Sequence, residues 1–555
     1  MESPKGNSPK SGGRESAGKE SEVRSGLVRR ERVRSPEENY IRNHNGLHFP
    51  FGLRTLSLRT LSFFPLLFVF CIPNLNSMRL RAIILFSLVA LRLSGQDNTA
   101  PTVLVGGGVT SGSYTPFWLR ANQYGAVPTE ESYGTVGFET RGKVVLSKRA
   151  DWSYGLAARL NLAETKADPM IQEAYVTGRY GIFELQLGRK KQLQGLMDST
   201  LSSGSYIWSG NALPMPMINL VVNDYWAPKF VKDVVGFKGN FAHGWFDNQR
   251  GDVSNFYLHQ KSFYGRLGKP NWLFKFYGGF NHNVQWGGTL KYPDPGNFSA
   301  KNGKIATGLK EYFYMITGQS MNVVGGDTAT YGINDGWNRL GNHLGSVDVG
   351  MEVDWSKAKL FFYRQSVYED GSLYYGNNIT DGLHGVALTR KADQGLIKVV
   401  VEYLNTSSQG GSTFNSTNVN RGLDNYFNNG VYREGWTYDG KGIGTAMMTL
   451  DSETDLTTTN LTYFDNNRVE SFYVGVEAKL GVNAIHFRGS MSNAFGWFGQ
   501  EFVPVKKQYS IGIQWQRPID LMGYDAQLKA SIGADKGLWK PDVIGGNLSL
   551  VLPLN

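Results

Sequence analysis

The sequence predicts an all-β protein, a transmembrane antiparallel β-barrel of about 18 strands whose long extracellular loops cap the lumen. The apolar fraction of 41 % and the mean hydropathy of −0.31 exclude a polytopic helical membrane protein. A barrel remains possible, because it needs only about ten alternating residues per crossing. The 68 glycines, 28 tyrosines and 13 tryptophans are typical of such barrels. In addition, many segments alternate between apolar and polar residues, and short turns and long loops join them in turn.

The segment from Val347 to Trp355 illustrates the alternation. Its apolar face contains Val347, Val349, Met351, Val353 and Trp355, and its other face contains Asp348, Glu352 and Asp354. A soluble sandwich would bury the apolar face, whereas a membrane barrel would turn it toward lipid. In the barrel, the valines face lipid, Trp355 joins an interfacial aromatic girdle and the acidic residues face the lumen.

The connections between strands decide between these alternatives. Short turns with the sequences SKAK, KADQG, GVN and PIDLMG follow every second strand. The longest connection, from Asn405 to Arg468, has roughly 60 residues, which is far beyond ordinary loop lengths. Bacterial outer-membrane barrels have this asymmetry, with short periplasmic turns and long extracellular loops. The NNG, YREGW and YDGKG stretches of the long connection indicate turns, so we expect it to fold inward and close the lumen to bulk solutes.

Earlier segments continue the scheme and bring the total to roughly 18, an even number as single-chain barrels require. The alternation is clear from Trp152 to Leu162 and from Phe183 to Leu187, and further strands are predicted near residues 102, 133, 171, 214, 231 and 257. One weak helical candidate spans Leu193 to Leu201.

Residues 78–95 have the organisation of a secretory signal peptide. Two arginines precede a short apolar core, and Ser94 and Gly95 offer small residues for cleavage before Gln96. We expect residues 1–77 to be a disordered upstream extension that does not belong to the native protein. Residues 78–95 are then the signal peptide and residues 96–555 the barrel. An apolar run at 63–72 is too short for a transmembrane helix.

The excess of positive charge belongs mostly to this leader. The chain carries 57 basic and 47 acidic residues, a net charge of +10. Because 15 of the basic and 7 of the acidic residues lie within residues 1–95, the remainder has 42 against 40. The pI of about 9.2 therefore gives no support to nucleic-acid binding. The single cysteine, Cys71, also lies in the leader, so the exported barrel is expected to lack disulfides.

Seven stretches give the chain its resemblance to a known family. They are TPFWLRANQYG (115–125), SGNALPMP (209–216), YLHQKSFYGRLG (257–268), FYGGFNHNVQWGG (276–288), GNHLGSVD (341–348), FYRQSVYEDGSL (362–373) and NNGVYREGWTYDGKGIGT (428–445). Together they resemble the Wzi family of capsule assembly proteins, in the form found in Bacteroidetes, from about Val103 to Leu554. The resemblance implies an outer-membrane barrel of about 18 strands and a lectin that attaches capsular polysaccharide to the cell surface.

Charged residues of both signs are predicted to face the lumen. They are Arg159, Glu184, Lys275, Asp348, Glu352, Lys398, Glu402, His486, Arg488 and Lys529. They could line a path for solute or glycan, but we favour a mutually neutralising network because buried charges need partners. The six histidines of residues 96–555 lack metal-ligand spacing, and GKGIGT is no dinucleotide fingerprint. No metal or other cofactor is therefore predicted.

The predicted function is that of a non-enzymatic outer-membrane lectin that anchors or assembles capsular or related surface polysaccharide. The alternatives are a porin for solutes and, less favoured, a barrel enzyme with a nucleophile or base near the outer rim. Single-channel conductance would identify a porin, and hydrolysis of lipid or ester substrates would identify an enzyme. The expected partners are the polysaccharide, outer-membrane lipid and the barrel assembly machinery of a Gram-negative bacterium. Nucleic acid is not expected as a partner, and the barrel is expected to be a monomer.

Candidate carbohydrate contacts lie at the predicted extracellular mouth, because sugars stack on aromatic rings and bond to carboxylates and amides. They form three groups: residues 282–286 at the end of one strand, residues 364–370 at the end of a second strand, and residues 432–436 in the long connection. These residues are His282, Gln285, Trp286, Arg364, Glu369, Asp370, Tyr432, Arg433, Glu434 and Trp436. The alternative for the long connection is structural, with Arg433 and Glu434 forming a pair and Trp436 packing the cap.

Overall fold

The computed structural model describes residues 97–554, apart from gaps at 248–250, 293–295, 297, 299, 327, 370–371, 414–421, 455–462 and 539. The expected extension (1–77) and signal peptide (78–95) lie outside the described residues. Within the described ranges, no helix is both long enough and apolar enough to cross a membrane.

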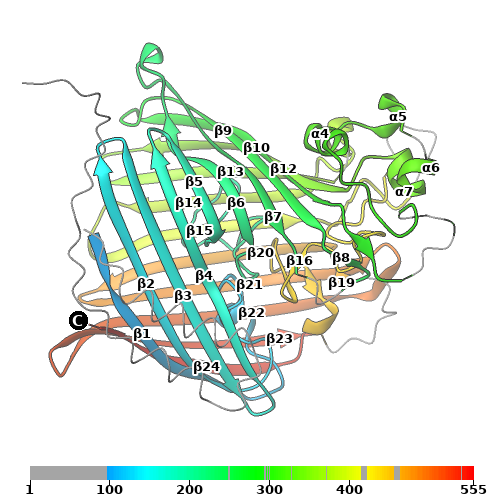
Figure 1. Ribbon diagram of the computed structural model, residues 1–555. Helices are drawn as coiled ribbons and strands as arrows, with labels where there is room; N and C mark the ends of the chain where they lie inside the picture. The colour runs from blue at the N-terminus through cyan, green and yellow to red at the C-terminus, as the bar shows by residue number, and fades with distance from the viewer. Residues whose placement is uncertain are drawn as a thin grey trace, which may run out of the picture. The chain divides into compact units, whose positions relative to one another are not determined.

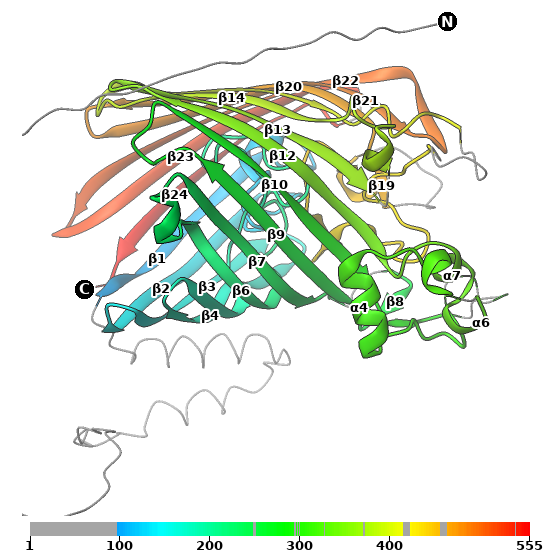
Figure 2. The same cartoon turned by 90° about the horizontal axis from the view of Figure 1, so that it is seen from above.

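A closed antiparallel barrel of 18 strands confirms the predicted fold class. Each barrel strand pairs with the next along the chain, and the first pairs with the last, so the sheet has no free edge (Figures 1 and 2). In Figure 1 the closure is visible where blue β1 lies beside red β24. The strands are β1 (Asp97–Thr110), β2 (Tyr133–Ser147), β3 (Ala150–Ala163), β4 (Ala167–Tyr180), β5 (Phe183–Arg189), β6 (Pro216–Trp226), β7 (Val235–Trp245), β9 (Tyr257–Leu267), β10 (Phe274–Trp286), β12 (Asn342–Asp354), β13 (Ala358–Glu369), β14 (Gly382–Arg390), β15 (Gly395–Asn405), β20 (Val469–Leu480), β21 (Asn483–Trp497), β22 (Gln500–Leu521), β23 (Tyr524–Gly537) and β24 (Val543–Pro553).

Alternate side chains of each strand face outward and into the lumen, as predicted. On β12, Val347 and Val349 are 43 % and 56 % exposed on the outer wall, whereas Asp348 between them is fully buried. Trp355, just beyond the strand, is exposed. A wall that presents valine outward and buries a carboxylate inward suits lipid outside and a polar interior.

Short turns gather at one end of the barrel and long loops at the other. The four predicted short turns all lie at the first end, which we call the turn end; they connect β12 to β13, β14 to β15, β20 to β21 and β22 to β23. The opposite end, the loop end, has the long connections 111–132, 190–215, 287–341 and 406–468. The predicted alternation of turns and loops is therefore confirmed.

Several short helices and two-stranded ribbons lie in the loops of the loop end. A short helix α3 (Phe117–Arg120) lies in the first loop, and three two-stranded ribbons occur in later loops. The ribbons are β8 (Val253–Ser254) with β11 (Thr289–Leu290), β16 (Thr437–Tyr438) with β17 (Lys441–Gly442), and β18 (Thr449–Leu450) with β19 (Phe464–Asn466). Single turns of 3-10 helix are η3 (Ser372–Tyr375) and η4 (Asp451–Glu453).

The 287–341 loop forms a helical lobe beside the barrel wall, near β9 and β10 in Figure 2. Its helices are α4 (Leu309–Thr317), α5 (Met321–Val324), α6 (Thr328–Tyr331) and α7 (Ile333–Trp337). Met315 and Met321 of the lobe pack against Val284 and Trp286, which stand on the outward face of β10. The lobe therefore covers part of the wall that would otherwise face outward.

Two local predictions need correction. Leu193–Leu201 is not helical; the segment crosses the lumen in an irregular conformation, with Gly195 at a φ of 107°. Its backbone groups are bound by wall side chains, described below, in place of helical partners. The strand predicted near residue 231 begins only at Val235, because a 3-10 turn, η1 (Lys229–Val231), follows Pro228 and ends at left-handed Lys232.

Candidate functional site

Wall carboxylates fix the 190–215 loop, which we call the plug, across the lumen. On β12, the carboxylate of Asp348 accepts the backbone N–H of Leu196 at 2.9 Å. On β15, Glu402 accepts the backbone N–H of Ser203 at 2.7 Å and the hydroxyl of Ser202 at 2.6 Å. Both carboxylates are buried, and a buried acceptor that binds N–H groups avoids the large cost of an unpaired charge. The lumen carboxylates thus hold a segment of chain.

Other lumen charges pair with one another. The ammonium of Lys275 lies 2.8 Å from Glu352 and 3.1 Å from Asp354, all three on the wall. Lys398 reaches Asp198 of the plug at 2.8 Å. These ion pairs agree with the predicted neutralising network.

Two further loops fill the lumen. In the first loop, Phe117 donates its backbone N–H to Asp535 on β23 at 2.8 Å, and buried Arg120 pairs with Glu453 of the long connection at 2.5 Å. The described part of 406–468 packs on the plug as a cap. Trp436 of the cap is fully buried, and its indole N–H donates to the carbonyl of Ile207 at 2.8 Å. For the described residues, the prediction that the long connection caps the lumen is confirmed.

Four residues at the loop end form a solvent-exposed group, which we call the mouth patch: Asp252, Lys291 and Tyr292 of neighbouring loops and Arg433 of the cap. The guanidinium Nε of Arg433 lies 3.4 Å from the Asp252 carboxylate, and the Arg433 side chain is 61 % exposed. The backbone N–H of Lys291 donates to the carbonyl of Asp252 at 2.8 Å. Tyr292 is 67 % exposed. An exposed ring beside charged hydrogen-bonding groups can stack on a sugar and bind its hydroxyls.

Glu434 is buried next to the mouth patch. Burial raises the pKa of its carboxyl to about 8, and the nearby carboxylates of Asp247 and Asp252 act in the same direction, whereas Lys291 opposes them. At neutral pH the group is therefore mostly protonated, and it presents a hydroxyl donor instead of an anion.

We expect the cap to lose stability as the pH rises from about 4.5 to about 8 because of Glu434. In this window the unfolded cap has already released the proton that the folded cap still binds, so ionisation favours the unfolded form. A Glu434→Gln variant should lack this component, and thermal melts of both proteins at pH 5 and pH 8 measure it. Identical pH dependence in the two proteins would contradict the assignment. Other titrating groups, such as Lys441 and Lys540, whose pKa values are lowered by desolvation, contribute equally to both proteins and cancel when the two pH dependences are compared.

The family model described as capsule assembly protein Wzi matches residues 107–473. The chain belongs to the Wzi family of capsule assembly proteins. A comparison with curated proteins finds no match.

Among solved structures, this Wzi-family chain is similar to Wzi of Escherichia coli, described as an outer-membrane protein involved in group 1 capsule assembly and as a carbohydrate-binding β-barrel. The two share 14 % identity and a TM-score of 0.52 over 86 % of this chain and 88 % of the other. The outer-membrane protein OprD of Pseudomonas aeruginosa matches with 9 % identity and a TM-score of 0.42, over 83 % of this chain and 94 % of that one. Family and fold together make the chain an outer-membrane barrel.

Nine of the ten predicted contact residues of this Wzi-family barrel are among the described residues, on the strands and loops toward the loop end, and the structure divides them. His282 and Trp286 face outward from β10 and lie buried beside the helical lobe, where Trp286 packs on Tyr312 with ring centroids 5.3 Å apart. Arg364 stands on the outward face of β13, and Asp370 lies outside the described residues.

The structure brings the other predicted residues together in and above the cap. Gln285 faces inward and donates to the carbonyl of Gly435 at 2.9 Å, and Glu369 accepts the backbone N–H of Phe427 at 2.7 Å. Tyr432, Glu434 and Trp436 are buried, which confirms the alternative that Trp436 packs the cap. The alternative pair of Arg433 with Glu434 is wrong, since Arg433 pairs with Asp252.

Sequence reasoning missed three members of the mouth patch. Asp252, Lys291 and Tyr292 come from two separate loops, which the small ribbon of β8 and β11 joins. The sequence KYPDPG (291–296) could have indicated the exposed ring. Its tyrosine precedes two prolines and a glycine, a pattern typical of surface turns, where aromatic rings are seldom buried.

Proposed function

We propose that this Wzi-family barrel binds capsular or related surface polysaccharide at its loop end, as a non-enzymatic lectin whose loops face the cell exterior. The observation that carries the proposal is the combination of a filled lumen with an exposed, chemically mixed mouth patch. Plug, first loop and cap occupy the lumen, while the patch offers a ring and charged groups to solvent. The family to which the chain belongs supports the ligand class.

The filled lumen argues against the porin alternative. A porin needs a continuous aqueous path, but here Tyr206 and Ile207 of the plug are fully buried against Phe427 and Trp436 of the cap. In the signal-peptide interpretation, residues 78–95 direct export, which is consistent with a barrel that reaches the outer membrane.

We expect a Tyr292→Ala/Arg433→Gln variant to bind purified surface polysaccharide at least about tenfold more weakly, because it loses one stacking ring and one charged donor. Binding to the folded barrel in detergent and glycan retained on cells are the two measurements. Tyr180→Ala is the matched control, since Tyr180 is an exposed tyrosine at the turn end. A folded double variant that retains full glycan binding would remove the mouth patch from the mechanism.

A further inference from the structure

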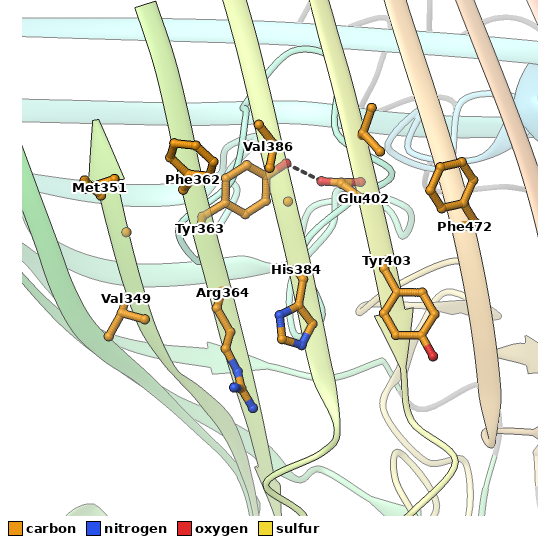
Figure 3. Close-up of a pocket in the computed structure, with 13 residues that line it drawn as sticks. Val349, Met351, Phe362, Tyr363, Arg364, His384, Val386, Glu402, Tyr403 and Phe472 are labelled. Carbon is orange, nitrogen blue, oxygen red and sulfur yellow. Dashed lines mark hydrogen bonds between the residues drawn. The ribbon is translucent and has the colours of Figure 1, made fainter. Parts of the chain in front are cut away.

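A hollow of about 610 Å³ lies on the outer wall of the barrel, across β12, β13, β14, β15 and β20 (Figure 3). Its lining is mostly apolar. The apolar side chains that line it are Val349, Met351, Phe362, Val386, Val401 and Phe472. Five of them, Val349, Phe362, Val386, Val401 and Phe472, are more than a third exposed, so the hollow opens toward lipid.

A row of polar side chains crosses this hollow on its loop-end side. Strand register places Arg364 opposite His384 and His384 opposite Tyr403, so that the three stand side by side on adjacent strands. Figure 3 shows them in one row, apart from the apolar side chains of Phe362 and Val386. The neighbouring row toward the turn end is apolar, with Phe362, Val386 and Val401 in register. The outer wall therefore changes from apolar to polar at Arg364.

Arg364 has binding capacity that the described protein does not use. One of its terminal nitrogens donates to the carbonyl of Ile379, and within the described ranges it forms no ion pair. Two described carboxylates whose charges act on Tyr403 of this row, Asp381 and Glu470, are engaged elsewhere. Asp381 accepts the backbone N–H of Gln409 at 2.8 Å and the hydroxyl of Tyr426 at 2.8 Å, and Glu470 accepts the side-chain amide of Asn493 at 3.4 Å.

A cation on a lipid-facing wall is costly unless an anion or the headgroup region receives it. A guanidinium next to an imidazole matches a phosphate group, since both present N–H donors and the guanidinium can bind two oxygens at once. The adjoining hollow is about five strands wide, or roughly 19 Å at about 4.8 Å per strand spacing, which is room for several acyl chains.

We propose that this wall binds a phosphorylated glycolipid of the outer leaflet, with several acyl chains in the hollow, a phosphate on Arg364 and His384, and a headgroup hydroxyl near Tyr403. The proposal rests on the proposed function in one respect, that the loop end faces the cell exterior. It does not involve the mouth patch, because Arg364 and His384 lie on the outer wall of the barrel, below the loops.

The test uses the full-length, folded, delipidated barrel in detergent and counts bound lipid by native mass spectrometry. The probes are diphosphorylated lipid A, the same lipid without its phosphates, and phosphatidylglycerol. We expect wild-type protein to prefer diphosphorylated lipid A over the dephosphorylated form by about tenfold, which corresponds to the loss of charge-assisted hydrogen bonds. Equal binding of the two forms would overturn the phosphate contact, and equal binding of phosphatidylglycerol would overturn the choice of a glycolipid.

An Arg364→Gln/His384→Gln variant should lose the preference for phosphate, with folding checked by heat-modifiable migration in electrophoresis. The matched control is Lys507→Gln/Lys536→Gln, which removes two exposed cations near the loop end of β22 and β23, away from the hollow. An equal loss in the control variant would assign lipid binding to general attraction and overturn the site. Because the lipid assay contains no polysaccharide, its failure is distinguishable from a failure of glycan binding at the mouth patch.

Discussion

A Trp436→Ala variant is expected to destabilise the cap by about 3–5 kcal/mol, the cost of truncating a fully buried tryptophan. Trp436 packs against Trp208 of the plug, with ring centroids 6.0 Å apart, and its indole N–H donates to the carbonyl of Ile207. Truncation would leave a cavity between cap and plug and an unpaired carbonyl. Hydrogen exchange of the amides in residues 424–450 measures the effect, since local opening controls their exchange.

Tyr524→Ala is the control for this substitution, because Tyr524 is a large aromatic residue exposed near the turn end. It should leave exchange in the cap unchanged. If exchange in the Trp436→Ala variant also stayed at the wild-type rate, the packing role of the indole would be contradicted. The experiment also separates two explanations of any lost glycan binding. If glycan binding and the protection of cap amides from exchange fall together, the mouth has lost its structure. If glycan binding falls in the Tyr292→Ala/Arg433→Gln variant while the cap amides stay protected, the variant has lost direct contacts with the glycan.

The barrel itself could be predicted because its signal is local. Period-two alternation along each strand, as at Val347 and Asp348, depends only on neighbouring residues, and strand pairing between chain neighbours follows from the turns. Because each strand of an antiparallel barrel reverses the direction of the one before it, every second connection lies at the same end of the barrel.

The placement of individual loop residues could not be predicted, because the contacts that decide it join distant parts of the chain. Asp348 binds Leu196, and Trp436 binds Ile207, although more than a hundred residues separate the members of each pair. An aromatic residue in a loop has the same sequence signature whether it stacks on a sugar or packs on protein. Trp286 and Trp436 pack on protein, whereas Tyr292 is exposed at the mouth patch.

The lumen of wild-type protein is expected to stay closed in planar bilayers, and an Asp348→Ala/Glu402→Ala variant is expected to conduct. Each carboxylate binds backbone N–H groups of the plug, and their removal leaves those groups buried without partners at about 1–3 kcal/mol each. The plug keeps other contacts, such as the backbone N–H of Tyr206 that Gln365 on β13 accepts at 2.9 Å. Loss of both carboxylates should nevertheless make residues 196–203 detach from the wall more often, on the timescale of a single-channel recording. The expected result is a change from rare, small events to frequent open states.

Glu352→Ala is the matched control for these plug anchors. Glu352 lies on the same strand and faces the same lumen as Asp348, but its carboxylate pairs with Lys275 of the wall, which keeps Asp354 as a second partner. This variant also removes one lumen carboxylate, yet it leaves the plug attached, so it should remain closed. Equal conductance of the two variants would mean that loss of lumen charge, and not release of the plug, opens the barrel. A large, steady conductance of the wild type would contradict the closed lumen itself and favour a porin, because a continuous water path requires that plug and cap leave the lumen together.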